Sequence, residues 1–217
     1  MTKQSSSKLN AYWNWQLEKE YWQSGKNYVA GVDEAGRGAL CGPVVAAAVI
    51  FKESFSEWEV IKDSKKLSPV QRKASYYTII KNAFCMGVGL ANSQEIDKIN
   101  IRNATHKAMI LALNNLSVAP EIILVDGNAK PFLSSQIRCI IKGDDEVVSI
   151  AAASIIAKVY RDYLMEEYAR VYPVYGFEKH KGYGTEEHII NIQKHGTTPW
   201  HRVSFRNTQF HQIKLFN

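Results

Sequence analysis

Apolar residues recur along the chain with two spacings, one typical of strands and one typical of helices. Short apolar or alternating runs predict strands at residues 28–33, 43–51, 85–92, 121–125 and 136–141. The run at 43–51 is almost continuously apolar, which indicates a strand buried on both faces. Longer runs with helical spacing predict helices at 69–84, 100–116, 147–170 and 185–195. Helices that alternate with apolar strands in this way predict a layered α/β domain.

Two short motifs add detail to the predicted helices. Ser68 has the position of a helix cap, Pro69 that of the first helical residue, and Gln71 completes a capping box, so a helix should begin there. Alanines at 151–153 and 157 are small enough for the third predicted helix to lie close against a sheet.

Composition and charge narrow the class of protein. The 217-residue chain is 46% hydrophobic, enough to bury a core, and its net charge of +6 suits a polyanionic partner such as nucleic acid. The cysteines Cys41, Cys85 and Cys139 are widely spaced, which argues against a disulfide framework or a zinc site and predicts reduced thiols. The apolar run at 44–51 is far shorter than the roughly 20 residues of a membrane span. Because the chain also begins without an apolar signal core, we expect a cytoplasmic protein that binds no membrane.

Residues 1–27 differ in pattern from the rest of the chain and are predicted to be a short N-terminal helical appendage to one domain at 28–217, which ends in a helical tail. Docking of an aromatic helix face on this domain is the preferred interpretation, and stacking on nucleic-acid bases is the alternative. The aromatic residues concerned are Tyr12, Trp13, Trp15, Tyr21 and Trp22.

Acidic residues come directly after several of the predicted strands or buried segments, namely Asp33, Glu34, Asp126 and Asp144. Strand ends are where open α/β sheets place their functional sites. Carboxylates brought together there repel one another unless a cation is bound, and such a set of oxygen ligands suits Mg²⁺ or Mn²⁺. Two divalent ions held in this way are the requirement for phosphodiester hydrolysis by two-metal catalysis.

Each carboxylate also has a purely structural explanation. Asp126 with Gly127 is a common turn pair, and Asp144 or its neighbour Asp145 can cap the next helix. Neighbours in a strand point to opposite faces, so Asp33 and Glu34 share a site only if they lie where the strand stops. The glycines at 36 and 38 predict such a break.

The longer motifs of the chain closely resemble those of the type 2 ribonucleases H, the ribonuclease HII family. The matching segments keep the family's order over residues 28–205. They are 31–38 (GVDEAGRG), 42–48 (GPVVAAA), 63–68 (DSKKLS), 125–127 (VDG), 142–144 (KGD), 151–162 (AAASIIAKVYRD) and 180–185 (HKGYGT).

This resemblance implies an RNase H-like α/β/α domain with a central mixed sheet and an endoribonuclease activity. The implied substrates are RNA in RNA/DNA hybrids and single ribonucleotides in duplex DNA, cut on the 5′ side of the ribonucleotide to leave a 3′-hydroxyl and a 5′-phosphate. By motif position, the family's four metal ligands fall on Asp33, Glu34, Asp126 and Asp144, with Asp145 as a helix cap.

The resemblance also implies the groups that hold the substrate. The loop Gly36-Arg37-Gly38 should approach the ribonucleotide, and Tyr183 should sense its 2′-hydroxyl, the group that distinguishes RNA from DNA. Lys65 is a candidate phosphate ligand, although a solvated charge is an equal alternative for it and for Lys66.

Lys158 and Arg161 are expected on the surface of their helix, with phosphate contact as the alternative. His180 and His188 are each either a surface histidine or a residue that assists substrate binding, and neither is expected to be a metal ligand. The alternatives to the whole assignment are a non-catalytic hybrid-binding protein and an RNase H-like nuclease acting on DNA. We expect a monomer, and the stretch 209–216 (QFHQIKLF) leaves a sliding clamp open as a partner, with a packed tail preferred.

Overall fold

The computed structural model describes residues 16–55, 61, 64–132 and 134–209. Its strands are β1 (Val29–Ala35), β2 (Val44–Ile50), β3 (Cys85–Ala91), β4 (Ile122–Asp126) and β5 (Ile137–Ile140). Its helices are α1 (Gln16–Gln23), α2 (Pro69–Asn82), α3 (Ser93–Asn114), α4 (Gly143–Glu146), α5 (Val148–Val171), the 3-10 turn η2 (Pro173–Tyr175), α6 (Phe177–His180), α7 (Glu186–His195) and α8 (Arg206–Gln209).

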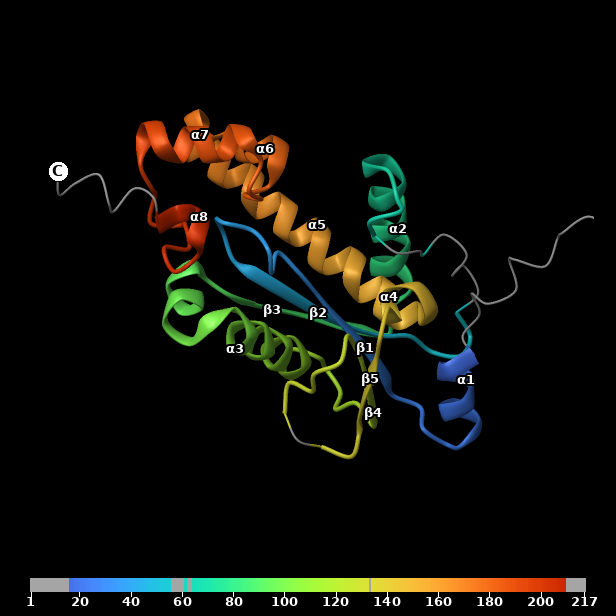
Figure 1. The fold of residues 1–217 in the computed structure, drawn as a ribbon. Coiled ribbons are helices and arrows are strands. Elements are labelled where there is room, and N and C mark those ends of the chain that lie inside the picture. Colours follow the sequence, from blue (N-terminus) through green and yellow to red (C-terminus); the bar gives the residue numbers. More distant parts are fainter. Residues whose placement is uncertain (1–15, 56–60, 62–63, 133, 210–217) are drawn as a thin grey trace, which may run out of the picture.

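The strands form one mixed sheet in the order β3-β2-β1-β4-β5 (Figure 1). Strand β2 pairs with β1 and β3 in the antiparallel sense, whereas β4 pairs with β1 and β5 in the parallel sense. All residues of β2 are buried, because the strand lies inside the sheet with helices over both faces. The predicted α/β class with a central mixed sheet is therefore confirmed.

Helices α3 and α5 cover opposite faces of the sheet (Figure 1). The start of α5 lies directly against β1, since a Cβ atom built on Gly31 would lie 2.1 Å from the carbonyl carbon of Ser149. Any larger residue at position 31 would push the helix off the sheet. The buried alanines of α5 complete this close contact, as their small size predicts.

The ends of several helices agree with the sequence. Ser68 and Gln71 form the predicted capping box, in which the Ser68 hydroxyl accepts from the Gln71 amide at 3.3 Å. Helix α7 begins at Glu186, one residue after the predicted start, and Thr185 is its N-cap. The start of α3 was predicted wrongly: the helix begins at Ser93, not at 100, and is kinked at Asn100, whose φ is 66° and ψ is 163°. The kink separates two helical phases, so only the second half shows the expected periodicity.

The described part of the N-terminal appendage packs on the domain. Trp22 of α1 is buried among residues of the sheet and α5. Glu18 is also buried, and its carboxylate accepts from the Ser149 backbone N–H at 2.9 Å and from the Ser149 hydroxyl at 2.8 Å. This carboxylate satisfies donors in the first turn of α5, where a negative charge also complements the helix dipole. The boundary at residue 27 stays a prediction.

The composition argued against a membrane span and against a disulfide framework. The described helices include none that is long and apolar enough to cross a membrane. Cys41 is buried, Cys85 and Cys139 are partly buried, and all three thiols are free, as predicted.

Candidate active site

The first two acidic residues lie at a point where β1 extends beyond its neighbour β4. The last pair between these strands joins Val32 to Val125, whereas Asp33 and Glu34 still pair with β2. Both residues therefore lie inside regular β-structure, and the prediction that they come after the strand was wrong. They nevertheless line one hollow of about 250 Å³ together with Asp126. The absence of a β4 partner past Val32 leaves the edge of β1 open, so side chains from opposite faces reach the same hollow.

Asp126 and Asp144 belong to the two segments beside this open edge. Asp126 ends β4, and its Oδ1 accepts from the backbone N–H of Gly143 at 2.7 Å. Asp144 lies in α4 with its side chain only 8% exposed, whereas that of Asp145 is 32% exposed. Lys65 donates to Asp144 at 2.9 Å, and Lys66 pairs with Asp145. Of the two neighbours, Asp144 is thus the one turned into the protein.

Burial and mutual repulsion disfavour negative charge in this cluster. Burial raises the pKa of Asp33 well above its usual range, and the charges of Glu34 and Asp126 raise it further. Burial also raises the pKa of Glu34, against the opposing effect of Arg37. The pKa of Asp126 is raised by burial first and by Asp144 second. A cation between these groups would relieve both penalties.

The donor chemistry of the cluster fits hard divalent cations. All four side chains offer carboxylate oxygens, the ligands that Mg²⁺ and Mn²⁺ prefer. Within the described residues, no three acidic, histidine or cysteine side chains already lie close enough together to hold an ion. Lys65 and Arg37 each pair instead with one carboxylate, Arg37 with Glu34 at 3.3 Å. A divalent cation would compete with Lys65 and Arg37 for these carboxylates, and a substrate phosphate would compete with the carboxylates for Lys65 and Arg37.

The loop after β1 is held by two buried arginines. Gly36 has a φ of +92°, and a Cβ atom on it would lie 2.0 Å from Nε of Arg161, so only glycine fits. Arg161 is fully buried and donates to the carbonyl oxygens of Cys41 and Pro43 at 3.0 Å and of Lys181 at 2.9 Å. Its expected surface position was therefore wrong. A helical position predicts exposure only where no loop packs over it.

Arg202 is the second of these arginines and was not predicted from the sequence. Its guanidinium donates to the carbonyl oxygens of Gly36 at 2.7 Å and Arg37 at 2.8 Å, and it is fully buried. Nothing in its spacing distinguishes it from a surface arginine. Ser154 was missed also: its hydroxyl bonds to Asp33 and lies 2.9 Å from the Ser64 hydroxyl.

Tyr183 lies at the rim of the same hollow and is 36% exposed. Its ring lies 5.3 Å from the Arg161 guanidinium carbon and 5.9 Å from Nζ of Lys158, so cations face it on one side. Its backbone oxygen lies 2.9 Å from Nδ1 of His188. His188 is fully buried, which rules out the surface alternative, and it belongs to the framework that holds the Tyr183 loop.

A buried pair of histidines in this framework gives a pH prediction. Nε2 of His188 lies 3.1 Å from Nε2 of His201, and burial lowers the pKa of His188 to about 4 and of His201 to about 3. The unfolded chain binds protons at these histidines more readily than the folded protein does. Their contribution to the free energy of unfolding is therefore complete above the pKa of an unfolded histidine, about 6.5, and is lost as the pH falls below that value. For His201 alone we expect a loss of about 2 kcal/mol between about pH 7.5 and about pH 5.

Urea unfolding at the two pH values measures this loss. His201→Asn should be less sensitive to acid than the wild type, and the same change at the exposed His195 should have no effect on sensitivity. If the His201 variant and the wild type lose the same unfolding free energy at low pH, His201 does not cause the acid sensitivity.

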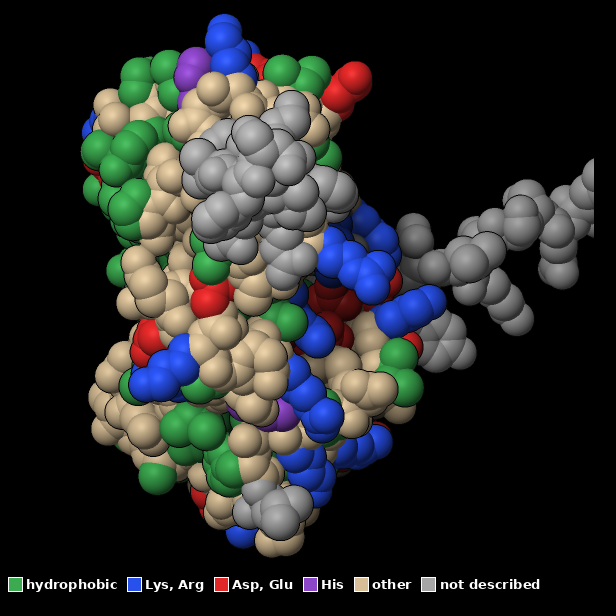
Figure 2. Space-filling model, turned by 60° about the vertical axis from the view of Figure 1, so that its left-hand side comes forward, with side chains coloured by type: hydrophobic (Ala, Val, Ile, Leu, Met, Phe, Trp, Pro, Cys, Tyr) green, Lys and Arg blue, Asp and Glu red, His purple; other side chains and the backbone are tan. Residues whose placement is uncertain are grey.

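The face of the molecule that bears the hollow is shown in Figure 2. Acidic side chains form the floor of a depression, and Lys and Arg side chains surround it. A negative floor within a basic rim is suited to a polyanion whose reacting phosphate is held by cations.

Comparison with known proteins decides the family. The family model for Ribonuclease HII matches residues 30–208. The chain belongs to the ribonuclease HII family. A relative named Ribonuclease HII from Clostridioides difficile is 50% identical over 189 residues, which cover 87% of this chain and 74% of the relative. The ribonuclease H2 of Pyrococcus horikoshii superimposes with a TM-score of 0.73 at 28% identity, covering 87% of this chain and 99% of that one.

Membership of the ribonuclease HII family establishes the class of activity. The protein is an endonuclease of the ribonuclease H class, a hydrolase acting on RNA–DNA hybrids. A further structural relative is RNase HII from Archaeoglobus fulgidus, solved as a complex with PCNA; its TM-score is 0.63 at 25% identity, over 82% of this chain and 95% of that one. The predicted family, fold and enzyme class are thus confirmed.

Proposed function

We propose that the protein hydrolyses the phosphodiester on the 5′ side of a ribonucleotide, in RNA/DNA hybrids and at single ribonucleotides in duplex DNA. The products are a 3′-hydroxyl and a 5′-phosphate. The observation that carries this proposal is the meeting of Asp33, Glu34 and Asp126 in one hollow with the glycine loop and Tyr183. The carboxylates serve the cleavage reaction, and the loop and Tyr183 select the ribonucleotide.

Asp33, Glu34, Asp126 and Asp144 would hold two divalent cations, Mg²⁺ or Mn²⁺. When bound, these ions supply an activated water and neutralise charge on the leaving oxygen. The residues around them fix the carboxylates: Ser154 bonds to Asp33, and the Gly143 amide orients Asp126. Lys65 lies beside Asp144 with its side chain 77% exposed, a position from which it contacts a substrate phosphate.

The loop Gly36-Arg37-Gly38 and Tyr183 distinguish a ribonucleotide from a deoxynucleotide in this proposal. The backbone of the loop approaches the sugar without a side-chain clash, because two of its residues are glycines. Arg202 behind the loop fixes the carbonyl groups of Gly36 and Arg37. The Tyr183 hydroxyl packs against a 2′-hydroxyl, and its ring is held in place by Arg161.

The first test uses a DNA duplex with one ribonucleotide beside the same duplex without it, each with Mg²⁺, with Mn²⁺ and with chelator. We expect a metal-dependent nick on the 5′ side of the ribonucleotide and none in the all-DNA control. Cleavage of both duplexes would identify a DNA nuclease, and binding without a nick would favour a non-catalytic hybrid-binding protein.

Tyr183→Phe should lower kcat/KM on the ribonucleotide-containing duplex by roughly fivefold, because a neutral hydrogen bond contributes about 1 kcal/mol. The measurement is kcat/KM on this duplex, with thermal unfolding to check stability. Tyr163→Phe is the matched control, since Tyr163 is 58% exposed on α5. Unchanged kcat/KM in the Tyr183 variant would show that its hydroxyl does not contact the sugar.

Partners, domain limits and oligomeric state remain at the level of expectation. Residues 210–216 of the stretch considered for a sliding clamp lie outside the described residues, as do residues 1–15. A monomeric state, a domain at 28–217 and a packed C-terminal tail therefore stay predictions, with clamp binding as the alternative for the tail.

A further inference from the structure

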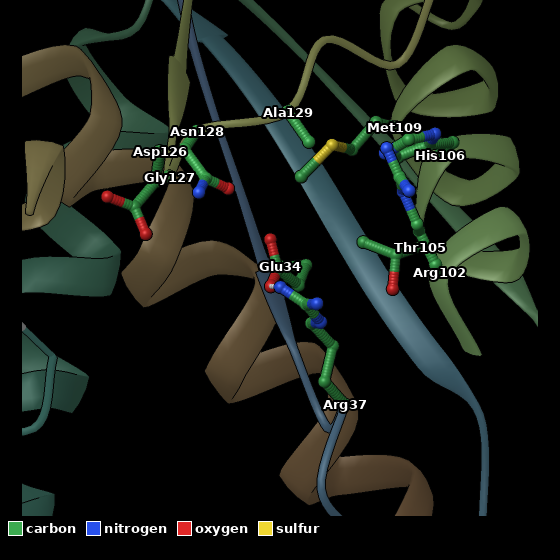
Figure 3. Close-up of a pocket in the computed structure, with 10 residues that line it drawn as sticks. All are labelled: Glu34, Arg37, Arg102, Thr105, His106, Met109, Asp126, Gly127, Asn128 and Ala129. Carbon is green, nitrogen blue, oxygen red and sulfur yellow. Dashed lines mark hydrogen bonds and ion pairs between the residues drawn. The ribbon is translucent and has the colours of Figure 1, made fainter. Parts of the chain in front are cut away.

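A second hollow, of about 390 Å³, adjoins the first, and Tyr183 lines only the first of the two. It is bounded by the end of β4 and by the second half of α3 (Figure 3). Glu34, Arg37 and Asp126 line both hollows, so these side chains form a ridge between the two. If the scissile phosphate of a nucleic-acid strand lies over this ridge, the strand must continue into both hollows.

The far wall of the second hollow is basic. Arg102 and His106 lie next to each other on α3 and face the cavity (Figure 3). Arg102 is exposed, and no hydrogen bond or ion pair engages its guanidinium within the described part of the chain. Partial burial lowers the pKa of His106, and the positive charges of Arg102 and Arg37 lower it further, which reports a positive potential on this wall. A guanidinium with free donors matches a phosphate group.

The position of Arg102 depends on the kink in α3. Asn100 has a φ of 66° and a ψ of 163°, a conformation that costs a non-glycine residue energy. Its side-chain oxygen accepts from the Asn103 amide at 3.1 Å, which restarts the helix one residue before Arg102. The restarted helix carries Arg102 and His106 along the wall that faces Glu34 and Asp126.

We infer that Arg102 binds the first backbone phosphate on the 5′ side of the scissile phosphate, within the hollow that it forms with His106. This inference rests on the proposed function. The ribonucleotide on the 3′ side of the cut lies against the glycine loop and Tyr183, so the nucleotide on the 5′ side extends toward α3. A contact made to the cut strand on this side positions the scissile phosphate over the carboxylates.

The experiment combines a protein change with a substrate change. The variants are Arg102→Gln and, as a matched control, Arg138→Gln, an exposed arginine in β5 that lines a separate hollow beside α1. One substrate is the duplex with one ribonucleotide. The other is the same duplex in which a neutral methylphosphonate replaces the first phosphate on the 5′ side of the scissile phosphate. The readouts are kcat, KM and the dependence of kcat/KM on salt.

On the native duplex, Arg102→Gln should lower kcat/KM by about tenfold, as expected for a charge-assisted hydrogen bond. The slope of log kcat/KM against log salt should fall by about 1 in the same variant. The neutral linkage should weaken the wild type and Arg138→Gln to a similar extent, and should weaken Arg102→Gln no further. Unchanged thermal unfolding would confirm that this exposed substitution leaves the fold intact.

Three other outcomes overturn the inference. Equal kcat/KM for the Arg102 and Arg138 variants would show that Arg102 makes no contact. An additional loss in Arg102→Gln on the neutral linkage would place its contact at another phosphate. Both of these outcomes are compatible with the proposed function. If instead the wild-type protein does not cut at the ribonucleotide, both the proposed function and the inference are wrong.

Discussion

Asp33→Asn and Asp126→Asn are each expected to lower turnover of an RNA–DNA hybrid by at least about a thousandfold, a barrier increase of about 4 kcal/mol. The two carboxylates lie in one hollow and would hold the divalent cations that the reaction requires. Asparagine keeps the size of the side chain but removes the charge, so the cations lose affinity while the packing is retained. The measurement is kcat on a hybrid at saturating Mg²⁺ and Mn²⁺, with circular dichroism to check the fold.

The neighbouring pair in α4 supplies the control for this prediction. Asp144→Asn should lose turnover as the Asp33 and Asp126 variants do, whereas Asp145→Asn should keep near wild-type rates, because Asp145 is the more exposed and pairs with Lys66. Normal metal-dependent rates in the Asp33 and Asp126 variants would refute the assignment of the site. Loss of activity in the Asp145 variant alone would identify Asp145, and not Asp144, as the fourth metal ligand.

Arg161→Ala is expected to lower the free energy of unfolding by about 3–5 kcal/mol, because three backbone carbonyl groups would lose a hydrogen-bond donor, at about 1–3 kcal/mol each. The guanidinium is fully buried and bonds to three backbone carbonyl groups in two loops, which would be left without donors. Because the same side chain packs against Gly36 and Tyr183, cleavage of the ribonucleotide-containing duplex should fall as well.

The same helix provides a matched arginine. Arg170→Ala should change the unfolding free energy by less than about 0.5 kcal/mol, because Arg170 is exposed and makes only a surface pair with Glu167. Urea unfolding compares the two variants directly. A small effect at position 161, similar to that at 170, would mean that the loop keeps its conformation without the guanidinium.

The sequence predicted those features that depend on local patterns. The apolar run at 43–51 predicted β2, and the Ser68 to Gln71 motif predicted the start of α2, since period and capping act over a few residues. The long motifs predicted the family, and with it the mixed sheet and the enzyme class. The assignment of the four carboxylates as metal ligands came from the same motifs and stays a prediction until the asparagine variants are measured.

The errors have a common cause in contacts between distant segments. Arg161 looks like a surface residue in its helix, but the loops around Cys41 and Lys181 pack over it. Arg202 carries no local signal at all, yet it fixes the carbonyl groups of Gly36 and Arg37. Neither contact can be predicted from periodicity, because the partners are far apart in the chain.

By itself, the sequence determined which residues of this protein form strands, which begin a helix and which motifs carry acidic groups. Only the tertiary structure decided that Asp33 and Glu34 share a hollow from within one strand, because the edge of β1 is open only where β4 has ended. It also decided that Arg102 lines one hollow with Glu34 and Asp126, since the kink at Asn100 directs the second half of α3 toward them. Strand pairing and helix direction are set by packing over the whole domain, which no local pattern contains.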